Sequence, residues 1–379
     1  MPPAKIGFYG HVRQYHNLKK EIDAAFFEVM ESGTYVLGPK VKQFEQELAA
    51  YCNMKEAVGV NSGTDALWLV FLALGIAPGD EVITTSNTFF ATAEAIWLVG
   101  ATPVFVDIDP KTCNIDTNLI EAAISPKTKA IVPVHLYGQP ADMRAVAKIA
   151  KAHQLFVIED GAQALGARAD DFAIGALSDA VCTSFIIQKN LGCFGDGGAV
   201  VTNNPAIATQ IRKLRNHGSL KRSHHGIGYN SRLDELHAAI LSVKLPQLDK
   251  WSDQRRVHAK QYDEGLAGTS LKLPYARPGY RHVYHLYVVE TEDRDGLQAY
   301  LDSQGITALT HYPIAIHQQE GYPWGHAARI SGSLPHTERS AAQVLSLPMY
   351  PELTQEEVQA VIKAIRAWEK MRRAKTHAA

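Results

Sequence analysis

The sequence predicts an α/β protein whose mainly parallel sheet is covered by helices on both faces. Short apolar, β-branched runs at residues 81–86, 102–108 and 155–160 are typical of strands, and amphipathic patterns between them are typical of helices. Buried strands that alternate with helices indicate a parallel sheet, because each helix returns the chain to the end where the previous strand began. Polar residues that follow such strands therefore meet at one end of the sheet, where ligands of this fold class bind.

A smaller α+β domain is predicted after the sheet. From about residue 248 the alternation gives way to a strand over residues 281–291, a further helix, and a long helix over residues 354–373. The 379 residues suffice for two such units with a large core. We therefore predict a large domain at residues 1–249, which begins with a helical segment, and a small domain at residues 250–379.

The composition argues against several classes of protein. The net charge is −1, with 38 Lys plus Arg against 39 Asp plus Glu, which favours neither nucleic acid nor a membrane surface as a partner. No apolar run reaches the roughly 18 residues that span a bilayer, and the amino-terminal segment has no apolar signal region. The 16 histidines form no metal-binding motif. Widely spaced cysteines are typical of reduced thiols, so we expect a cytoplasmic protein without a metal site. The cysteines are Cys52, Cys113, Cys182 and Cys193.

One lysine lies in an unusual context. Lys189 belongs to the segment 184–201, between apolar residues and a loop with four glycines. A lysine beside a glycine turn is ordinarily a solvated surface residue, but apolar neighbours on both sides would desolvate this amine. Desolvation lowers the pKa of a lysine and supplies the neutral amine that forms an imine. Lys189 is therefore a candidate for imine chemistry.

A carboxylate ends the strand that precedes this segment. Asp160 is the last residue of the run 155–160, and its ordinary role would be to cap the segment that follows. It can instead pair with a protonated pyridine nitrogen, so that the ring absorbs carbanion charge. Glu159 would point to the opposite face of a strand and is the weaker candidate. An acid at the end of one predicted strand and a lysine at the end of the next are what a pyridoxal phosphate enzyme requires.

A turn before a helix offers a phosphate site. The backbone N–H groups of Gly63 and Thr64 at this helix start can bind a phosphate, although such turns are equally common as plain helix caps. Ser184 precedes the candidate lysine by five residues and can add a hydroxyl group. Phe89, in a loop after a predicted strand, can stack on an aromatic cofactor or, as is more frequent for such residues, belong to the core.

Longer motifs occur in an order typical of one family. From about Gly10 to Lys370 the chain resembles the DegT/DnrJ/EryC1/StrS aminotransferases, which have the three-layer type I pyridoxal phosphate-dependent transferase fold. The motifs are NSGTDAL at 61–67, NTFFATAEAI at 87–96, PVHLYGQPADM at 133–143, VIEDGAQALGA at 157–167, SFIIQKNLGCFGDGGAVVTN at 184–203, GYNSRLDELHAAIL at 228–241 and THYPIAIHQQ at 310–319.

The resemblance implies a role for each candidate residue. Lys189 matches the lysine that holds pyridoxal 5'-phosphate as an internal aldimine and carries the proton, and Asp160 matches the partner of the pyridine nitrogen. Gln163 matches a contact to the ring hydroxyl, and Phe89 matches the aromatic residue stacked on the ring. Asn230 matches a residue that the neighbouring subunit contributes to the cofactor phosphate, which implies an obligate homodimer with shared active sites. The phosphate cradle corresponds to Gly63, Thr64 and Ser184.

Two positions depart from the family pattern. Leu165 stands where many members have histidine, and Ile187 with Gln188 stands where many have proline and a small residue. Neither change removes a catalytic group, so both bear on the shape of the sugar pocket. Some relatives have histidine in place of the lysine and dehydrate or deoxygenate sugars, and Lys189 argues against that reaction here.

The resemblance also implies a reaction, in which L-glutamate or glutamine aminates a nucleotide-linked keto sugar. Segments 230–245 and 282–319 are more similar to the branch that acts on dTDP-3-keto-6-deoxyhexoses than to the 4-keto branch, which is the alternative. Loop residues His311, Tyr312 and His317 then become candidates for sugar contacts, with ordinary loop packing as the competing explanation. A non-enzymatic regulatory protein that binds pyridoxal phosphate is the alternative from another class.

Overall fold

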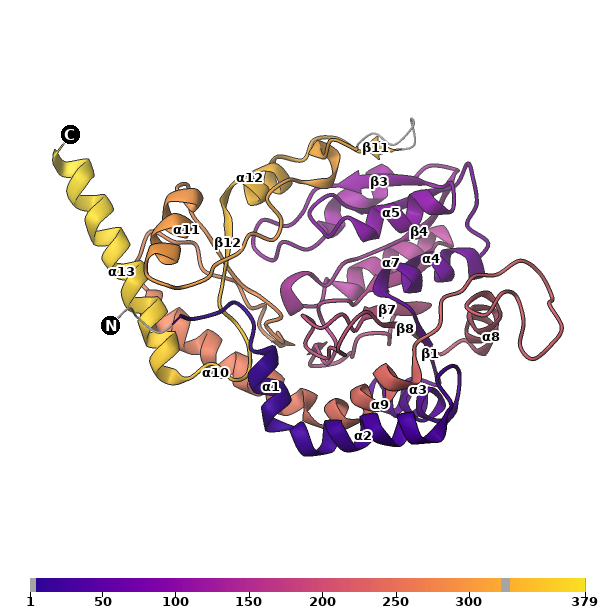
Figure 1. Cartoon of the computed structure of the whole chain (residues 1–379). Coiled ribbons are helices and arrows are strands. Elements are labelled where there is room, and N and C mark those ends of the chain that lie inside the picture. The colour runs from indigo at the N-terminus through magenta and orange to yellow at the C-terminus, as the bar shows by residue number, and fades with distance from the viewer. Residues whose placement is uncertain (1–4, 322–327, 379) are drawn as a thin grey trace.

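The computed structural model describes residues 5–321 and 328–378, and within them the core is an eight-stranded sheet (Figure 1). Neighbouring strands follow the order β1-β8-β7-β5-β4-β2-β3-β11. Neighbours from β7 to β11 pair in parallel, whereas β8 runs antiparallel to both strands beside it. The prediction of a mainly parallel α/β sheet is confirmed. The strands are β1 (Glu56–Val60), β2 (Glu81–Thr85), β3 (Thr102–Val106), β4 (Thr128–Ile131), β5 (Phe156–Asp160), β7 (Ala180–Ser184), β8 (Gly198–Thr202) and β11 (Arg329–Ile330).

Helices cover both faces of the sheet because its strand residues alternate between two apolar layers. Val58 and Val60 pack on the side of α4, α5 and α8. Ala57 and Val201 face the opposite side, which α3 and α9 cover at one end and α6 and α7 at the other. Each fully buried side chain of this size stabilises the layers by roughly 1.5–3 kcal/mol. The helices are α3 (Pro39–Tyr51), α4 (Gly63–Ala73), α5 (Ala91–Leu98), α6 (Ile120–Ala123), α7 (Met143–His153), α8 (Pro205–Leu214) and α9 (Glu235–Lys244).

A second, smaller sheet forms the centre of the carboxyl-terminal part. Strands β10 and β12 pair antiparallel, and α10, α11 and α13 share one apolar cluster with them. Ile6 pairs with Ile306, so the start of the chain lies against this part, whereas β11 extends the central sheet beside β3. The domain boundary near residue 250 stays a prediction. The remaining helices and strands are α1 (His11–Asn17), α2 (Lys19–Ser32), β6 (Arg168–Ala169), α10 (Leu248–Leu266), β9 (Tyr280–Arg281), β10 (Tyr287–Glu290), α11 (Arg294–Ser303), α12 (Pro335–Gln343), β12 (Val344–Leu347) and α13 (Gln355–Ala378), with 3-10 turns η1 (Thr117–Leu119), η2 (Leu136–Gly138), η3 (Leu245–Gln247) and η4 (Ile316–Gln318).

Two strands are shorter than the sequence predicted. β7 ends at Ser184, five residues before Lys189, because the backbone then closes a turn in which the Lys189 N–H donates to the Ile186 carbonyl. β10 covers only four residues of the strand predicted over 281–291, because Tyr284 has a left-handed φ of 42° that interrupts extended backbone. In both places the apolar residues continue from the strand into a turn and are buried in each. The apolar pattern alone therefore does not show where the strand ends.

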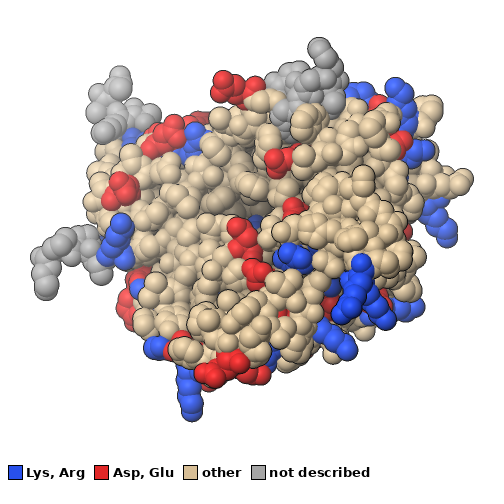
Figure 2. Space-filling view, turned by 45° about the vertical axis from the view of Figure 1, so that its right-hand side comes forward, with Lys and Arg blue, Asp and Glu red and all other residues tan. Residues whose placement is uncertain are grey.

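The described residues contain no helix long and apolar enough to cross a membrane. Figure 2 shows acidic and basic side chains on the same face of the molecule, separated by wide areas that carry neither. This mixed surface agrees with the near-zero net charge of the sequence.

Glu235, the first residue of α9, attaches α3 to the large sheet. Its buried carboxylate accepts hydrogen bonds from the backbone N–H groups of Gly38, Lys40 and Val41 at 2.8, 2.9 and 2.8 Å. N–H groups at a helix start have no acceptor within the helix. One carboxylate therefore caps α3 and couples it to α9.

We expect Glu235→Ala to lower the melting temperature by roughly 5 °C or more, because three N–H groups would lose a charged acceptor. Thermal unfolding followed by circular dichroism measures the change. Glu31→Ala, which removes an exposed carboxylate of α2, is the control and should leave the melting temperature nearly unchanged. Equal melting temperatures in the two variants would contradict the capping role.

Candidate functional site

Lys189 and Asp160 lie together beyond the carboxyl ends of β7 and β5, which are neighbours in the sheet. Asp160 is the last residue of β5, and Lys189 lies in the turn after β7. Burial lowers the pKa of Lys189 to about 8, and the negative charge of Asp160 partly opposes that shift. A fraction of the amine is therefore neutral near physiological pH, as imine formation requires.

The Asp160 carboxylate is held in place by neutral hydrogen-bond donors. Thr92 Oγ1 donates to Asp160 Oδ2 at 2.7 Å, and the Ala162 N–H donates to Oδ1 at 3.2 Å. Thr92 Oγ1 also lies 3.0 Å from the hydroxyl of Thr88. Both carboxylate oxygens are thus oriented by donors that carry no charge.

The neighbouring acid serves a different purpose. Glu159 Oε2 lies 2.6 Å from His135 Nε2, and its Oε1 accepts from the Gly175 N–H at 2.9 Å. His135 Nδ1 accepts from the Ala141 N–H at 3.0 Å, so Nε2 carries the proton that is donated to Glu159. Both carboxylate oxygens of Glu159 therefore have partners within the protein, in agreement with its assessment as the weaker candidate.

Gln163 lies between two tyrosines. Its Oε1 accepts from the Tyr137 N–H at 2.7 Å, and its Nε2 donates to Tyr312 Oη at 3.0 Å. Tyr137 has a left-handed φ of 59°, which is uncommon for a residue with a side chain and occurs often at functional sites. Burial and the charge of Asp160 raise the pKa of Tyr312, so its hydroxyl stays protonated.

The turn before α4 packs closely against β7 and β8. A Cβ atom on Gly63 would come within 2.7 Å of Ser184 Cβ, and one on Gly198 within 2.3 Å of the Ser62 carbonyl oxygen. Ser62 caps α4 by accepting a hydrogen bond from the Asp65 N–H at 3.0 Å. The first N–H groups of α4 and the Ser184 hydroxyl therefore lie side by side, and this donor set fits the phosphate of pyridoxal phosphate.

Phe89 and His311 border the same space. The Phe89 ring is 54% exposed, and its centroid lies 5.8 Å from that of Tyr312. His311 Nδ1 lies 2.8 Å from Ser346 Oγ. Burial and the positive charge of Lys189 lower the pKa of His311 to about 4, so the imidazole is neutral at physiological pH.

His317 is occupied by protein partners. Its Nδ1 lies 2.8 Å from Ser86 Oγ, and its Nε2 lies 3.2 Å from Glu338 Oε1. The His317 N–H also donates to Ser86 Oγ at 3.0 Å. These contacts hold the loop after β2 that leads to Phe89, which favours the packing explanation for His317.

Thr64 and Asn230 are the remaining residues predicted for the phosphate site. Thr64 lies half-buried in the first turn of α4. Asn230 is exposed, and its backbone bridges to Asn216. Ser231, next to it, donates to Asp65 Oδ2 at 2.6 Å, so this segment passes the start of α4 in the same chain.

Sequence reasoning missed three residues of the site. Thr92 and Tyr137 orient Asp160 and Gln163, and both lie within motifs that the sequence displays. His285 faces Asn190, with Nδ1 3.1 Å from Oδ1, and burial together with Lys189 lowers its pKa strongly. His285 lies in an apolar segment predicted as a strand, so no signal distinguished it.

Comparison with known proteins gives a family match and close relatives. The model of the DegT/DnrJ/EryC1/StrS aminotransferase family matches residues 16–366. The dTDP-3-amino-3,4,6-trideoxy-alpha-D-glucose transaminase of Streptomyces venezuelae is 49% identical over 366 residues, which cover 96% of each chain. A protein of Geobacillus stearothermophilus named pleiotropic regulatory protein is 49% identical over 356 residues, 93% of this chain and 95% of the relative.

A solved structure agrees with the fold. S. venezuelae DesV in complex with a ketimine intermediate matches with a TM-score of 0.94 and 47% identity, over 97% of this chain and 99% of that chain. This agreement confirms the predicted three-layer type I fold.

We expect the apoprotein to combine with pyridoxal phosphate at a rate that rises with pH through about 8 and levels off above it, because the neutral amine of Lys189 reacts. Asp160→Asn should move the midpoint to lower pH, because the carboxylate raises the pKa of Lys189. Stopped-flow absorbance across a pH series measures both midpoints. Asp302→Asn, an exposed control on α11, should keep the wild-type midpoint. An unchanged midpoint in Asp160→Asn would show that this carboxylate does not influence the pKa of Lys189.

Proposed function

The chain belongs to the DegT/DnrJ/EryC1/StrS aminotransferase family, and we propose that it transfers an amino group from L-glutamate or glutamine to C3 of a dTDP-linked 3-keto-6-deoxyhexose. The chain is a pyridoxal phosphate-dependent aminotransferase that acts on a nucleotide-linked keto sugar. The name of the Streptomyces relative, a dTDP-3-amino sugar transaminase, supports C3 as the position. A 4-keto substrate is the alternative, and the position of the new amine in the product separates the two.

The juxtaposition of Lys189 and Asp160 carries the catalytic part of the proposal. Bound pyridoxal phosphate supplies a carbonyl for imine formation and a ring that delocalises negative charge. Asp160, oriented by Thr92, would keep a proton on the pyridine nitrogen. Lys189 would bind the carbonyl carbon, yield it to the amine of the donor, and then carry the proton from the donor α-carbon to the cofactor C4′.

Neighbouring residues would orient the ring for this proton transfer. The Ser184 hydroxyl and the N–H groups at Gly63 and Thr64 would hold the phosphate. Gln163, fixed between two tyrosines, would contact the ring hydroxyl. The exposed ring of Phe89 is available to stack on the cofactor face.

The sugar would enter on the side of the loop at residues 311–312. His311 is neutral and lies near Lys189, so its ring can contact sugar hydroxyls without adding charge beside the amine. Tyr312 contacts Gln163 and has a protonated hydroxyl. We retain both as sugar contacts and assign His317 to support of the loop after β2.

A regulatory role is the alternative from another class. It rests on the name of the Geobacillus relative, which is a pleiotropic regulatory protein. A neutral lysine is enough to bind the cofactor covalently, whereas an oriented carboxylate that would keep the pyridine nitrogen protonated is useful for turnover and supports the aminotransferase. Turnover of amino donor and keto sugar separates the two functions.

A homodimer completes the proposal. Asn230 would reach the cofactor phosphate of a second subunit. We also propose that the protein is cytoplasmic, because its free cysteines would stay reduced there. Exposed apolar side chains surround this segment and α2, as expected of a surface that a second copy covers. They include Ile227, which is 87% exposed, and Phe27, which is 61% exposed.

We expect complementation between two inactive variants. Lys189→Ala and Asn230→Asp subunits, co-expressed with different tags, would form a heterodimer in which one site has both wild-type residues if Asn230 acts in trans. The tandem-purified heterodimer should regain roughly half of the wild-type activity, while each homodimer stays at least tenfold below it. An inactive heterodimer would place Asn230 in its own subunit, as the contact of Ser231 with α4 permits.

The first half-reaction provides the direct test of function. L-Glutamate added to the yellow holoenzyme should remove the visible band of lysine-bound cofactor and release 2-oxoglutarate, and a dTDP-3-keto-6-deoxyhexose should restore the band. Lys189→Ala should lower turnover by at least about 10³-fold, whereas Lys148→Ala, at an exposed lysine of α7, should match the wild type. Cofactor binding without any donor response would favour the regulatory alternative.

A further inference from the structure

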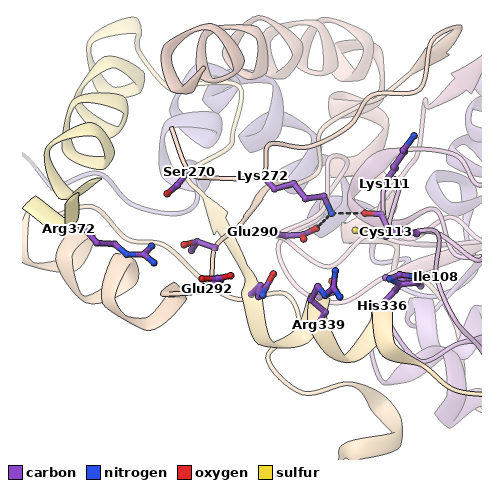
Figure 3. Close-up of a pocket in the computed structure, with 14 residues that line it drawn as sticks. Ile108, Lys111, Cys113, Ser270, Lys272, Glu290, Glu292, His336, Arg339 and Arg372 are labelled. Carbon is purple, nitrogen blue, oxygen red and sulfur yellow. Dashed lines mark hydrogen bonds and ion pairs between the residues drawn. The ribbon is translucent and has the colours of Figure 1, made fainter. Parts of the chain in front are cut away.

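A second cavity lies at the junction of the two parts of the chain, away from the lysine site. Its volume is about 530 Å³. The segment after β3, the end of β10 and the helices α12 and α13 form its walls (Figure 3). Its lining contains none of the residues assigned to the cofactor or the sugar. The charged and polar residues that matter below are Lys111, Lys272, Glu290, Glu292, His336, Arg339, Ser340 and Arg372.

The charge of this lining is positive. Four cationic side chains stand against two carboxylates, and one of those carboxylates, Glu290, is already paired with Lys272 at 2.6 Å. Within the described part of the chain, the side chains of Lys111 and Arg339 have neither a hydrogen bond nor an ion pair. Figure 3 shows Arg339, on α12, below the pair of Lys272 and Glu290. It also shows the Arg372 side chain extending from α13 toward the cavity. The cavity therefore has cationic groups available to an anion.

Buried polar atoms that lack well-formed hydrogen bonds line the same wall. Ser340 is buried, with a relative exposure of 3%, and its hydroxyl lies beside the Cys113 thiol and the Tyr137 hydroxyl without a well-formed hydrogen bond to either. His336 Nδ1 is buried and has no hydrogen-bond partner in the described structure. His336, Arg339 and Ser340 are spaced so that they share one face of α12. A buried polar atom without a well-formed hydrogen bond is costly, so these atoms indicate a place that a polar ligand satisfies.

The start of α12 is not itself the ligand site. The Asp107 carboxylate accepts from the N–H groups of His336 and Thr337 at 2.9 and 2.8 Å, and from the Thr337 hydroxyl at 2.7 Å. An anion in the cavity would therefore bind through side chains. The flat guanidinium of Arg339 suits two phosphate oxygens at once.

We propose that this cavity binds a small phosphorylated sugar or similar phosphate ester. Arg339 and Ser340 would hold the phosphate, and the carboxylates of Glu290 and Glu292 would accept hydrogen bonds from hydroxyl groups. The volume lies within the roughly 300–1,000 Å³ typical of small-molecule sites. Cys113 of the cavity wall shares an apolar cluster with Tyr137, whose N–H contacts Gln163. The ligand thus lies one layer of side chains behind the candidate active site.

Isothermal titration calorimetry on the holoenzyme tests the proposal. Pyridoxal phosphate occupies its own site in that form, so a phosphate probe does not bind at the cofactor phosphate, and the Arg339 variant separates the cavity from the substrate site. Inorganic phosphate, glucose 1-phosphate and citrate are titrated separately, and we expect glucose 1-phosphate to bind most tightly because it offers both phosphate and hydroxyl groups. Arg339→Glu should weaken its binding at least tenfold, and Ser340→Ala should weaken it by a smaller factor.

Lys363→Glu is the matched control, because it makes the same change of charge on the exposed side of α13, outside the cavity. Its affinity for glucose 1-phosphate should equal that of the wild type. Arg339 is exposed, so its replacement should preserve the melting temperature. Undiminished binding of glucose 1-phosphate to Arg339→Glu would show that it binds outside this cavity and would contradict the proposal. Absence of binding to the wild type, or tighter binding of citrate than of either phosphate, would overturn the proposal.

Discussion

The chemistry of this protein depends on the burial of one lysine amine beside one carboxylate that does not neutralise it. A direct ion pair would favour the charged lysine and remove its nucleophilic form. No salt bridge joins the two side chains, and the oxygens of Asp160 accept hydrogen bonds from Thr92 and the Ala162 N–H instead. Burial then prevails, and the pKa of Lys189 falls to about 8.

This arrangement follows from the geometry of a parallel sheet. β5 and β7 are neighbours and end at the same edge, which brings Asp160 and the turn containing Lys189 together. Strand alternation sends Glu159 to the other face, where His135 and Gly175 hold it. Two adjacent acids therefore have separate functions, one supporting the fold and one facing the site.

Polar contacts also determine how the smaller part meets the sheet. Within the smaller part itself, the buried guanidinium of Arg255, on α10, donates to the carbonyls of Tyr284, His285 and Met349. Asp107, after β3, caps α12 at the opposite side of the junction. The imidazoles of His285 and His311 both lie near Lys189 and come from this part of the chain. The junction that brings these residues to the lysine also encloses the second cavity.

The sequence by itself determined the alternation of strands and helices, the lysine and acid near the ends of successive strands, and the glycine turn that begins α4. These features are local, since apolar periodicity and residue type are enough to predict them. It predicted the strand before Lys189 too long, because an apolar residue such as Phe185 is buried equally well in a turn. Only the tertiary structure decided that Thr92 and Tyr137 orient Asp160 and Gln163. Hydrogen bonds between segments far apart in the chain leave no periodic signal, and they exist only once the sheet has brought those segments to one edge.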